Sequence, residues 1–258
     1  MSFFRFLRIA FLLLVLIIVA GSNLLTRART TDWNESLWVY IYPLAGDQTK
    51  ITQRYLSQLK LRDFKAIEGY LSDQAEAYGH STDQPVKLTL MPVLESNPPQ
   101  LDETPNIISV VWWTTRMRWW SWNISRQSDQ PEPDIKLFIR FHDPRRLRVL
   151  ERSVGLQKGK VGLINAFASR QMNGSNNVVI THELLHTLGA SDKYDPASGQ
   201  PLVPIGLAEP DRKPLYPQAR GEIMAVRVAL SDSRSEMPKS LRGTVIGQAT
   251  AAEIGMLK

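Results

Sequence analysis

The sequence predicts a domain of mixed α/β or α+β class over residues 31–258. The first observation is composition: the chain has 258 residues, of which 43% are hydrophobic and 22% charged, as expected for a globular protein with a sizeable core. The second is that short apolar runs typical of strands alternate with segments of helical spacing. The third is the absence of an internal repeat. Together they indicate strands and helices mixed within one domain.

The first half of this domain is predicted to contain a strand, two helices and a second strand. Residues 37–42, LWVYIY, form an apolar run that Pro43 ends, which is typical of a buried strand. Apolar residues then recur at helical spacing, and a later segment alternates as a strand until Pro92 marks its end or a sheet edge. In chain order the predicted elements are a strand at 37–42, helices at 50–61 and 64–78, and a strand at 86–93.

Residues 107–124, IISVVWWTTRMRWWSWNI, predict a helix that holds five of the seven tryptophans. One face of this helix is defined by residues three and four apart, namely Ile108, Trp112, Thr115, Trp119 and Trp122. Core packing is favoured over a platform for a membrane surface or a substrate, because a helix that is apolar on most sides is usually buried. Arg116 and Arg118 interrupt the apolar run, so a membrane span here is not expected.

The second half of the domain combines strands with a long irregular part. β-Branched and aromatic residues predict the strands, and a cluster of Asn, Gly and Ser predicts a turn. Proline and glycine without periodicity predict the irregular part. In chain order the predicted elements are strands at 135–141 and 161–168, a turn at 173–176, an irregular segment at 195–221, and a closing helix at 249–256.

Residues 1–30 predict a membrane anchor or a signal segment. Arg5 and Arg8 precede twelve unbroken apolar residues from Ile9 to Ala20. A cleaved signal peptide would need a good small-residue site, which the sequence near Ala20 does not offer. An uncleaved signal-anchor, spanning as a transmembrane helix of about 17–25 residues, is therefore favoured. We expect the rest of the chain to be membrane-anchored and extracytoplasmic (periplasmic or at the cell surface), or secreted if the segment is cleaved.

Charge and cysteine content restrict the chemistry. The formal net charge is +6, and arginines crowd residues 140–152, RFHDPRRLRVLER. A solvated face is favoured there, with a patch for anionic lipid or an acidic substrate as the alternative. No nucleic-acid-binding motif is present, so no nucleic-acid partner is expected. The absence of cysteine excludes disulfides, thiolate catalysis and cysteine metal ligands.

The motif HExxH at residues 182–186 is the strongest chemical signal in the sequence. On a helix, His182 and His186 lie on one face, one turn apart, so both imidazoles can bind the same zinc ion. Glu183 is placed to act as the general base for a zinc-activated water. The other histidines, His80 and His142, have no partner at ligand spacing and predict no metal role.

A catalytic zinc site needs a third protein ligand and one open position. Gly189 can end the helix and reverse the chain, because glycine tolerates a positive φ. Asp192 follows by three residues and is the favoured third ligand, which completes the pattern HExxHxxGxxD. Other carboxylates compete for this role, and the sequence does not rank them finally: Asp195, Glu209 and Glu222.

The pattern resembles the metzincin zinc endopeptidases, whose HExxHxxGxxH motif is followed by a methionine turn. The aspartate in the last position resembles the snapalysin-type variant. Residues 221–225, GEIMA, offer the methionine turn, with Met224 beneath the metal. The resemblance implies a zincin-like twisted mixed sheet with an active-site helix, followed by an irregular C-terminal subdomain closed by a helix. The turn departs from some members in having Val226 where they carry tyrosine.

These patterns predict a membrane-anchored zinc-dependent endopeptidase that hydrolyses peptide bonds of a protein or peptide substrate. One zinc ion would be held by His182, His186 and Asp192, with Glu183 as the catalytic residue. The alternative is a non-proteolytic zinc-binding envelope protein that binds a partner through the tryptophan helix and the arginine cluster. Glu183 favours the enzyme, because a binding module has no chemical need for a base at that position. Substrate identity and oligomeric state are not predicted.

Overall fold

The computed structural model describes residues 29–257 except 101–105, 151–152 and 157–159, together with a few positions before residue 15. It corrects the predicted transmembrane helix and signal-anchor. Among the described residues, no helix is both long and apolar enough to cross a membrane. Most of the apolar run from Ile9 to Ala20 lies outside the described residues.

A five-stranded, mostly parallel sheet forms the centre of the fold, in the order β2-β1-β3-β5-β4. Four strands are parallel and lie close to the predicted positions: β1 (Leu37–Ala45), β2 (Val86–Leu90), β3 (Ile135–His142) and β5 (Val161–Phe167). The edge strand β4 (Val154–Leu156) runs antiparallel to β5 and was not predicted. The α/β class is therefore confirmed.

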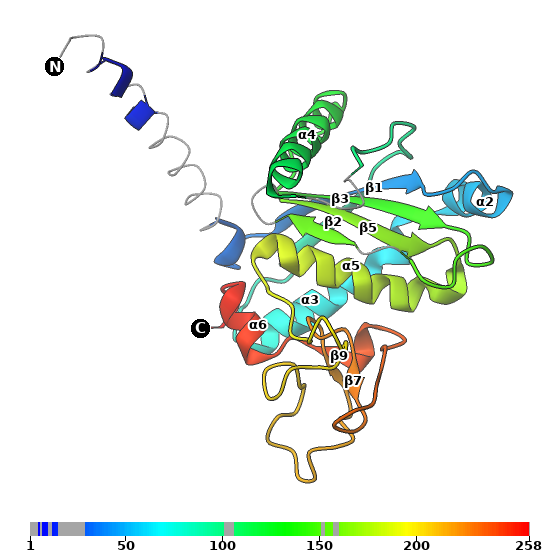
Figure 1. The fold of residues 1–258 in the computed structure, drawn as a ribbon, viewed down its shortest axis with the longest axis vertical. Coiled ribbons are helices and arrows are strands. Elements are labelled where there is room, and N and C mark those ends of the chain that lie inside the picture. Colours follow the sequence, from blue (N-terminus) through cyan, green and yellow to red (C-terminus); the bar gives the residue numbers. More distant parts are fainter. Residues whose placement is uncertain are drawn as a thin grey trace.

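Helices cover both faces of the sheet (Figure 1). On one face lies α4 (Ile107–Arg126), and on the other lie α3 (Lys65–Ala77) and α5 (Asn173–Leu188). The helix α2 (Lys50–Gln58) lies at the end of the sheet that β1 reaches. The larger hydrophobic core fills the space between the sheet and the α3 and α5 face. Both the sheet and the helices contribute residues without exposed surface to this core, such as Ile139 and Leu184.

The tryptophan helix α4 is only half buried. Trp113 and Met117 pack with Phe138 of β3 in a second, smaller core. The opposite face is exposed, with Trp112 63% and Trp119 65% accessible. The core-packing interpretation is therefore right for one face of α4 and wrong for the other.

The part of the chain after α5 forms a lower region beneath the sheet and its helices (Figure 1). Residues 189–220 carry only isolated bridges, as the predicted irregular segment requires. Four two-residue strands and two short helices follow: β6 (Gly221–Glu222), β7 (Val228–Ala229), β8 (Ser235–Glu236), the 3-10 turn η4 (Leu241–Gly243), β9 (Thr244–Val245) and α6 (Gln248–Glu253). The predicted closing helix is present but shorter.

The turn predicted at residues 173–176 is instead the first turn of α5. The side chains of its two asparagines, Asn173 and Asn176, find partners outside the helix. Asn173 accepts a hydrogen bond from the hydroxyl of Tyr55 at 2.8 Å. Asn176 bonds both the N–H and the C=O of Phe167, at 3.0 and 2.9 Å. These tertiary contacts remove the local competition that makes asparagine favour turns, so the helix begins earlier than predicted. A short 3-10 turn, η3 (Arg170–Met172), leads into it.

Candidate metal centre

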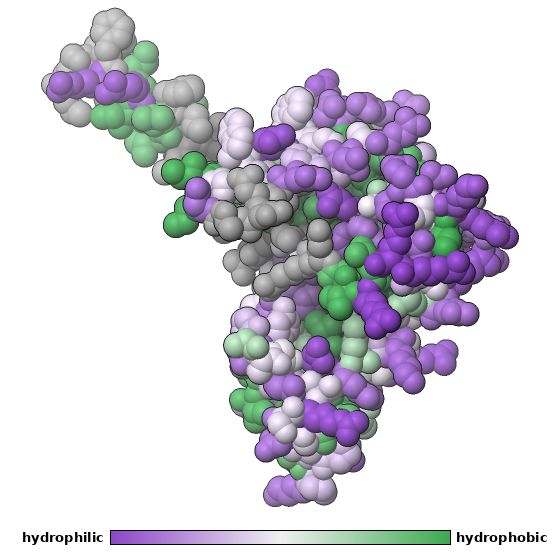
Figure 2. All heavy atoms as spheres, turned by 45° about the vertical axis from the view of Figure 1, so that its right-hand side comes forward, coloured by the Kyte–Doolittle hydropathy of each residue, from purple (hydrophilic) through white to green (hydrophobic). Residues whose placement is uncertain are grey.

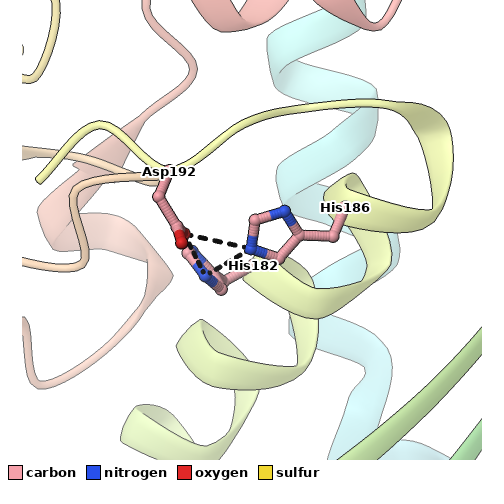
Figure 3. Close-up of side chains that lie close together, drawn as sticks. All are labelled: His182, His186 and Asp192. Carbon is pink, nitrogen blue, oxygen red and sulfur yellow. Dashed lines mark hydrogen bonds and ion pairs between the residues drawn. The ribbon is translucent and has the colours of Figure 1, made fainter. Parts of the chain in front are cut away.

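The helix α5 carries the predicted motif through the interior of the protein. Ile180, Leu184 and Leu185 have no exposed surface and belong to the larger core. They fix the rotation of the helix, which leaves His182 and His186 on the side facing the lower region (Figure 3). His182 retains only 6% of its accessible surface. Packing of the helix alone therefore fixes the positions of the two histidines.

Asp192 reaches the histidines because the chain reverses just after α5. Gly189 caps the helix with φ of 115°, a left-handed conformation that glycine adopts without strain. Asp192 Oδ1 then lies 3.2 Å from His182 Nε2 and 3.1 Å from His186 Nε2. The two Nε2 atoms are 3.0 Å apart. Figure 3 shows the three side chains pointing toward one another.

The remaining ring nitrogens orient the two histidines. His182 Nδ1 lies 3.2 Å from the carbonyl oxygen of Ile223, and His186 Nδ1 lies 2.8 Å from that of Ala190. Because a carbonyl can only accept, each Nδ1 must carry the hydrogen. In the neutral imidazoles, Nε2 then presents a lone pair, as a metal ligand does.

Three acceptor atoms therefore converge on one point, an arrangement that a positive charge stabilises. Among the described residues, His182, His186 and Asp192 form a group whose ligand atoms all lie within 4.8 Å of one another and could hold a metal ion. Two imidazole nitrogens and one carboxylate oxygen suit a divalent transition metal better than Ca²⁺ or Mg²⁺, which prefer oxygen alone. The donor set fits the predicted cofactor.

The protonation equilibria show the same demand for positive charge. Burial raises the pKa of the Asp192 carboxyl, but hydrogen bonds that His182 and His186 donate when their Nε2 atoms are protonated outweigh it, so the pKa lies far below its usual value. Burial lowers the pKa of His186, yet its hydrogen bond to Asp192 leads a set of contacts that raise it overall. A proton and a metal ion therefore compete for the same three atoms.

The other candidate carboxylates are engaged elsewhere. Asp195 accepts hydrogen bonds from Ser198 Oγ at 2.6 Å and from the backbone N–H of Ala197 at 3.1 Å. Glu209 accepts from Arg212 at 3.0 Å. The carboxylate of Glu222 accepts hydrogen bonds within its own segment and from the start of α6. Asp192 is thus the predicted carboxylate that the structure brings to the histidine pair.

The predicted methionine turn lies beside the site. Its Ile223 supplies the carbonyl that contacts His182, and the carbonyl of Met224 accepts the N–H of Lys193 at 3.0 Å. Glu222 holds the turn together, since its carboxylate accepts the N–H of Met224 at 2.6 Å and that of Ala225 at 3.0 Å. Burial raises the pKa of Glu222, although these hydrogen bonds act in the opposite direction.

Two adjoining cavities meet at the candidate site. The first, which we call the metal cavity, has a volume of ≈ 390 Å³ and is lined by Ser153, Gly155, His182, Glu183, His186, Asp192 and Tyr194. The second, the side cavity, has a volume of ≈ 450 Å³ and shares four of these residues, Ser153, His182, Glu183 and Tyr194. Glu183, which is 5% exposed, therefore faces both.

Gly155 of β4 allows the edge strand to approach α5 closely. A Cβ atom at this position would lie 2.6 Å from His186 Cβ and 2.7 Å from the carbonyl oxygen of Glu183. No larger residue fits without moving the strand or the helix. Sequence reasoning missed Gly155, because a lone glycine in a three-residue strand carries no distinguishing signal.

The remaining histidines contact other groups. His80 Nε2 lies 2.9 Å from the carbonyl oxygen of Met256, and His142 Nε2 lies 3.0 Å from Asn165 Oδ1.

Neither family models nor curated proteins give a match to this sequence. The resemblance to metzincins therefore rests on the motif residues themselves.

Proposed function

We propose that this protein is a zinc-dependent endopeptidase of metzincin type. The observation that carries the proposal is the position of Glu183, whose side chain lines the same cavity as His182, His186 and Asp192. A metal group without an adjoining base would suit storage or structural binding. A base at the edge of a metal group, with a cavity in front of both, suits hydrolysis.

Zinc is the metal we propose, because it commonly takes two histidines and one carboxylate and leaves a fourth position open. When bound, it would supply Lewis acidity, which acidifies a water molecule and polarises the scissile carbonyl. His182 and His186 would serve as neutral ligands, since their Nδ1 hydrogens are directed to the carbonyls of Ile223 and Ala190.

Glu183 would carry the proton transfers of the reaction. Its carboxylate accepts a proton as the nucleophile forms and returns it to the nitrogen of the leaving group as the peptide bond breaks. Burial of this side chain excludes bulk water from the path of the proton.

The metzincin assignment is part of the proposal and has three supports. The first is the HExxHxxGxxD sequence with its left-handed Gly189. The second is an antiparallel edge strand, β4, lying against the motif helix. The third is the segment 221–225, whose Ile223 carbonyl contacts His182.

One observation favours a second function, a zinc-binding protein that acts by binding a partner. The tryptophan face of α4 is exposed, with Trp112 and Trp119 more than half accessible. A module of this kind would retain zinc and have no use for the carboxylate of Glu183.

The test is a comparison of the zinc-loaded wild-type chain with its Glu183→Ala variant on a mixed peptide library. We expect equal zinc content in both and cleavage in the wild type alone, because only the base has been removed. Zinc in both proteins with cleavage in neither would reject the endopeptidase and favour the partner-binding function. Equal cleavage by both would remove Glu183 from the mechanism.

A further inference from the structure

The side cavity is a second compartment that opens from the candidate metal centre. It reaches His182 and Glu183 at one end, and its walls include the apolar side chains of Phe167 and Val179. Figure 2 shows hydrophobic side chains gathered where the sheet-bearing upper part of the molecule meets the lower region. A substrate that has its scissile bond beside Glu183 would therefore place a neighbouring side chain in this cavity.

Two arginines line the cavity from different parts of the chain. Arg148 comes from the connection between β3 and β4 in the upper part, and Arg227 comes from the lower region, just before β7. The side chain of Arg227 lies against Gly199, whose added Cβ would be 3.7 Å from its Nε atom. The two arginines thus line the same cavity from separate parts of the chain.

Among the residues that the structure describes, the charges lining the cavity are unbalanced. Within the described residues, neither Arg148 nor Arg227 forms an ion pair. Among the described lining residues, the acidic side chain is Glu183, which lies at the metal end. Both arginine side chains are exposed, so they attract an anion through a positive potential at the cavity that salt can screen.

We infer that the side cavity selects peptide substrates with an acidic side chain close to the scissile bond. This inference rests on the proposed endopeptidase function and names its substrate class. A carboxylate in the cavity would accept charge-assisted hydrogen bonds from Arg148 and Arg227. A neutral amide of the same shape would lose the charge, and a lysine side chain would be repelled.

Arg148 belongs to the arginine-rich stretch at residues 140–152. A solvated face was favoured for it from sequence, with an acidic substrate as part of the alternative. The structure places Arg148 of this stretch at the cavity that contains His182 and Glu183. Arg145 and Arg146 are exposed nearby in the chain, where they add to the positive potential around the cavity.

The test uses three peptides that differ at one position beside the cleaved bond and carry Glu, Gln or Lys there. We expect the zinc-loaded wild-type chain to cleave the Glu peptide with a kcat/KM about five- to tenfold above that of the Gln peptide, with the Lys peptide lowest. Higher salt should narrow the difference, because the arginines are exposed.

Charge-reversal variants identify the residues responsible. Arg148→Glu and Arg227→Glu should each reduce or invert the order of the three peptides while zinc content stays equal to the wild type. Arg54→Glu is the matched control, because it makes the same change of charge at an exposed position on α2 and should keep the wild-type order. Arg227→Gln repeats the test with a milder substitution should the reversal disturb folding.

The outcomes separate the two proposals. Equal cleavage of all three peptides by the wild type would overturn the inference and leave the endopeptidase in place. An acidic preference that survives in both Arg148→Glu and Arg227→Glu would also overturn it. No cleavage of any peptide by the zinc-loaded wild type would reject the proposed function, and the inference would fall with it.

Discussion

The ammonium group of Lys193 donates a hydrogen bond of 2.7 Å to the carboxylate of Glu253, on the closing helix α6. The same carboxylate accepts the backbone N–H and the hydroxyl of Ser191, at 2.8 and 2.7 Å. Lys193 is 1% exposed. The two residues that Glu253 links to α6, Ser191 and Lys193, flank Asp192 on either side. The helix α6 thus holds the loop that presents Asp192 to the histidine pair.

Breaking this contact should affect both stability and metal binding. We expect Glu253→Ala to lower the free energy of unfolding by about 2 kcal/mol, below the range for fully buried pairs because the Glu253 side chain is 34% exposed. Zinc affinity should also fall, because the residues on either side of Asp192 lose one backbone and two side-chain hydrogen bonds. Denaturant unfolding and competition with a chelator measure the two effects.

Glu76→Ala is the matched control for that change, since Glu76 is exposed on α3, far along the chain from the metal loop. It should alter stability by less than about 0.5 kcal/mol and leave zinc affinity unchanged. If Glu253→Ala behaved like Glu76→Ala, the closing helix would have no part in holding the ligand loop.

Two aspartates of the same loop should differ sharply in their effect on metal binding. Asp192→Ala removes a carboxylate oxygen from the group of three, and we expect zinc affinity to fall more than the roughly 10–100-fold typical of outer-shell partners. Asp195→Ala removes a carboxylate that bonds Ser198 and Ala197 within its own turn and should leave affinity unchanged. Titration with a zinc indicator measures both, and the reverse order would move the ligand role to Asp195.

The close approach of β4 to α5 predicts a selective effect of one methyl group. Gly155→Ala places a Cβ 2.6 Å from His186 Cβ, so the strand or the helix must shift. We expect a loss of about 1–3 kcal/mol in stability and a lower kcat/KM, because the shift displaces the neighbours of Glu183. Peptide cleavage and thermal unfolding measure these effects.

Gly69→Ala is the control for the added methyl group. Gly69 lies inside α3, and an added Cβ there meets no atom within 4 Å. The exchange should stabilise the helix by roughly 0.5–1 kcal/mol and leave cleavage unchanged. Equal behaviour of the two variants would mean that the contact between β4 and α5 tolerates the extra atom.

The end of the parallel sheet carries an acid-sensitive contact. Asp47 accepts the N–H of Asp143 at 2.7 Å and that of Thr49 at 2.9 Å, which joins the ends of β1 and β3 to the start of α2. Burial raises the pKa of Asp47, but these hydrogen bonds outweigh it and bring the pKa to about 2 from its ordinary value of 3.8.

A depressed pKa means that the ionised carboxylate stabilises the folded state. Its contribution is complete well above pH 3.8 and is lost as the pH falls through about 2. Relative to Asp47→Asn, the wild type should therefore be more stable by a constant amount near neutrality, and the difference should shrink toward zero in acid. Urea unfolding at a series of pH values measures it, and a difference that grew in acid would contradict the assignment.

The sequence was most informative where one local rule decided the structure. The apolar run at 37–42 and the helical spacing around 50–61 predict elements close to β1 and α2. In both, the local pattern of apolar residues is sufficient to indicate the type of element. The HExxH motif and Gly189 likewise define a helix, its end and the approach of Asp192.

It was least informative where distant partners decided. Residues 173–176 are helical, and the side chains of Asn173 and Asn176 find their partners in Tyr55 and Phe167 outside the helix. Gly155 and Glu253 act on the candidate site through residues far from them in sequence, and neither has a local pattern. Nothing in the periodicity of α4 indicated which tryptophans would remain exposed, since both of its faces are apolar.

The most direct test of the central claim is zinc-edge anomalous diffraction from crystals of the zinc-loaded protein. We expect one zinc peak within bonding distance of three protein atoms, with His182 Nε2 and His186 Nε2 at about 2.0–2.1 Å and an Asp192 oxygen at about 2.0–2.2 Å. Zinc found on Asp195, Glu209 or Glu222, or no zinc beside the histidine pair, would contradict it.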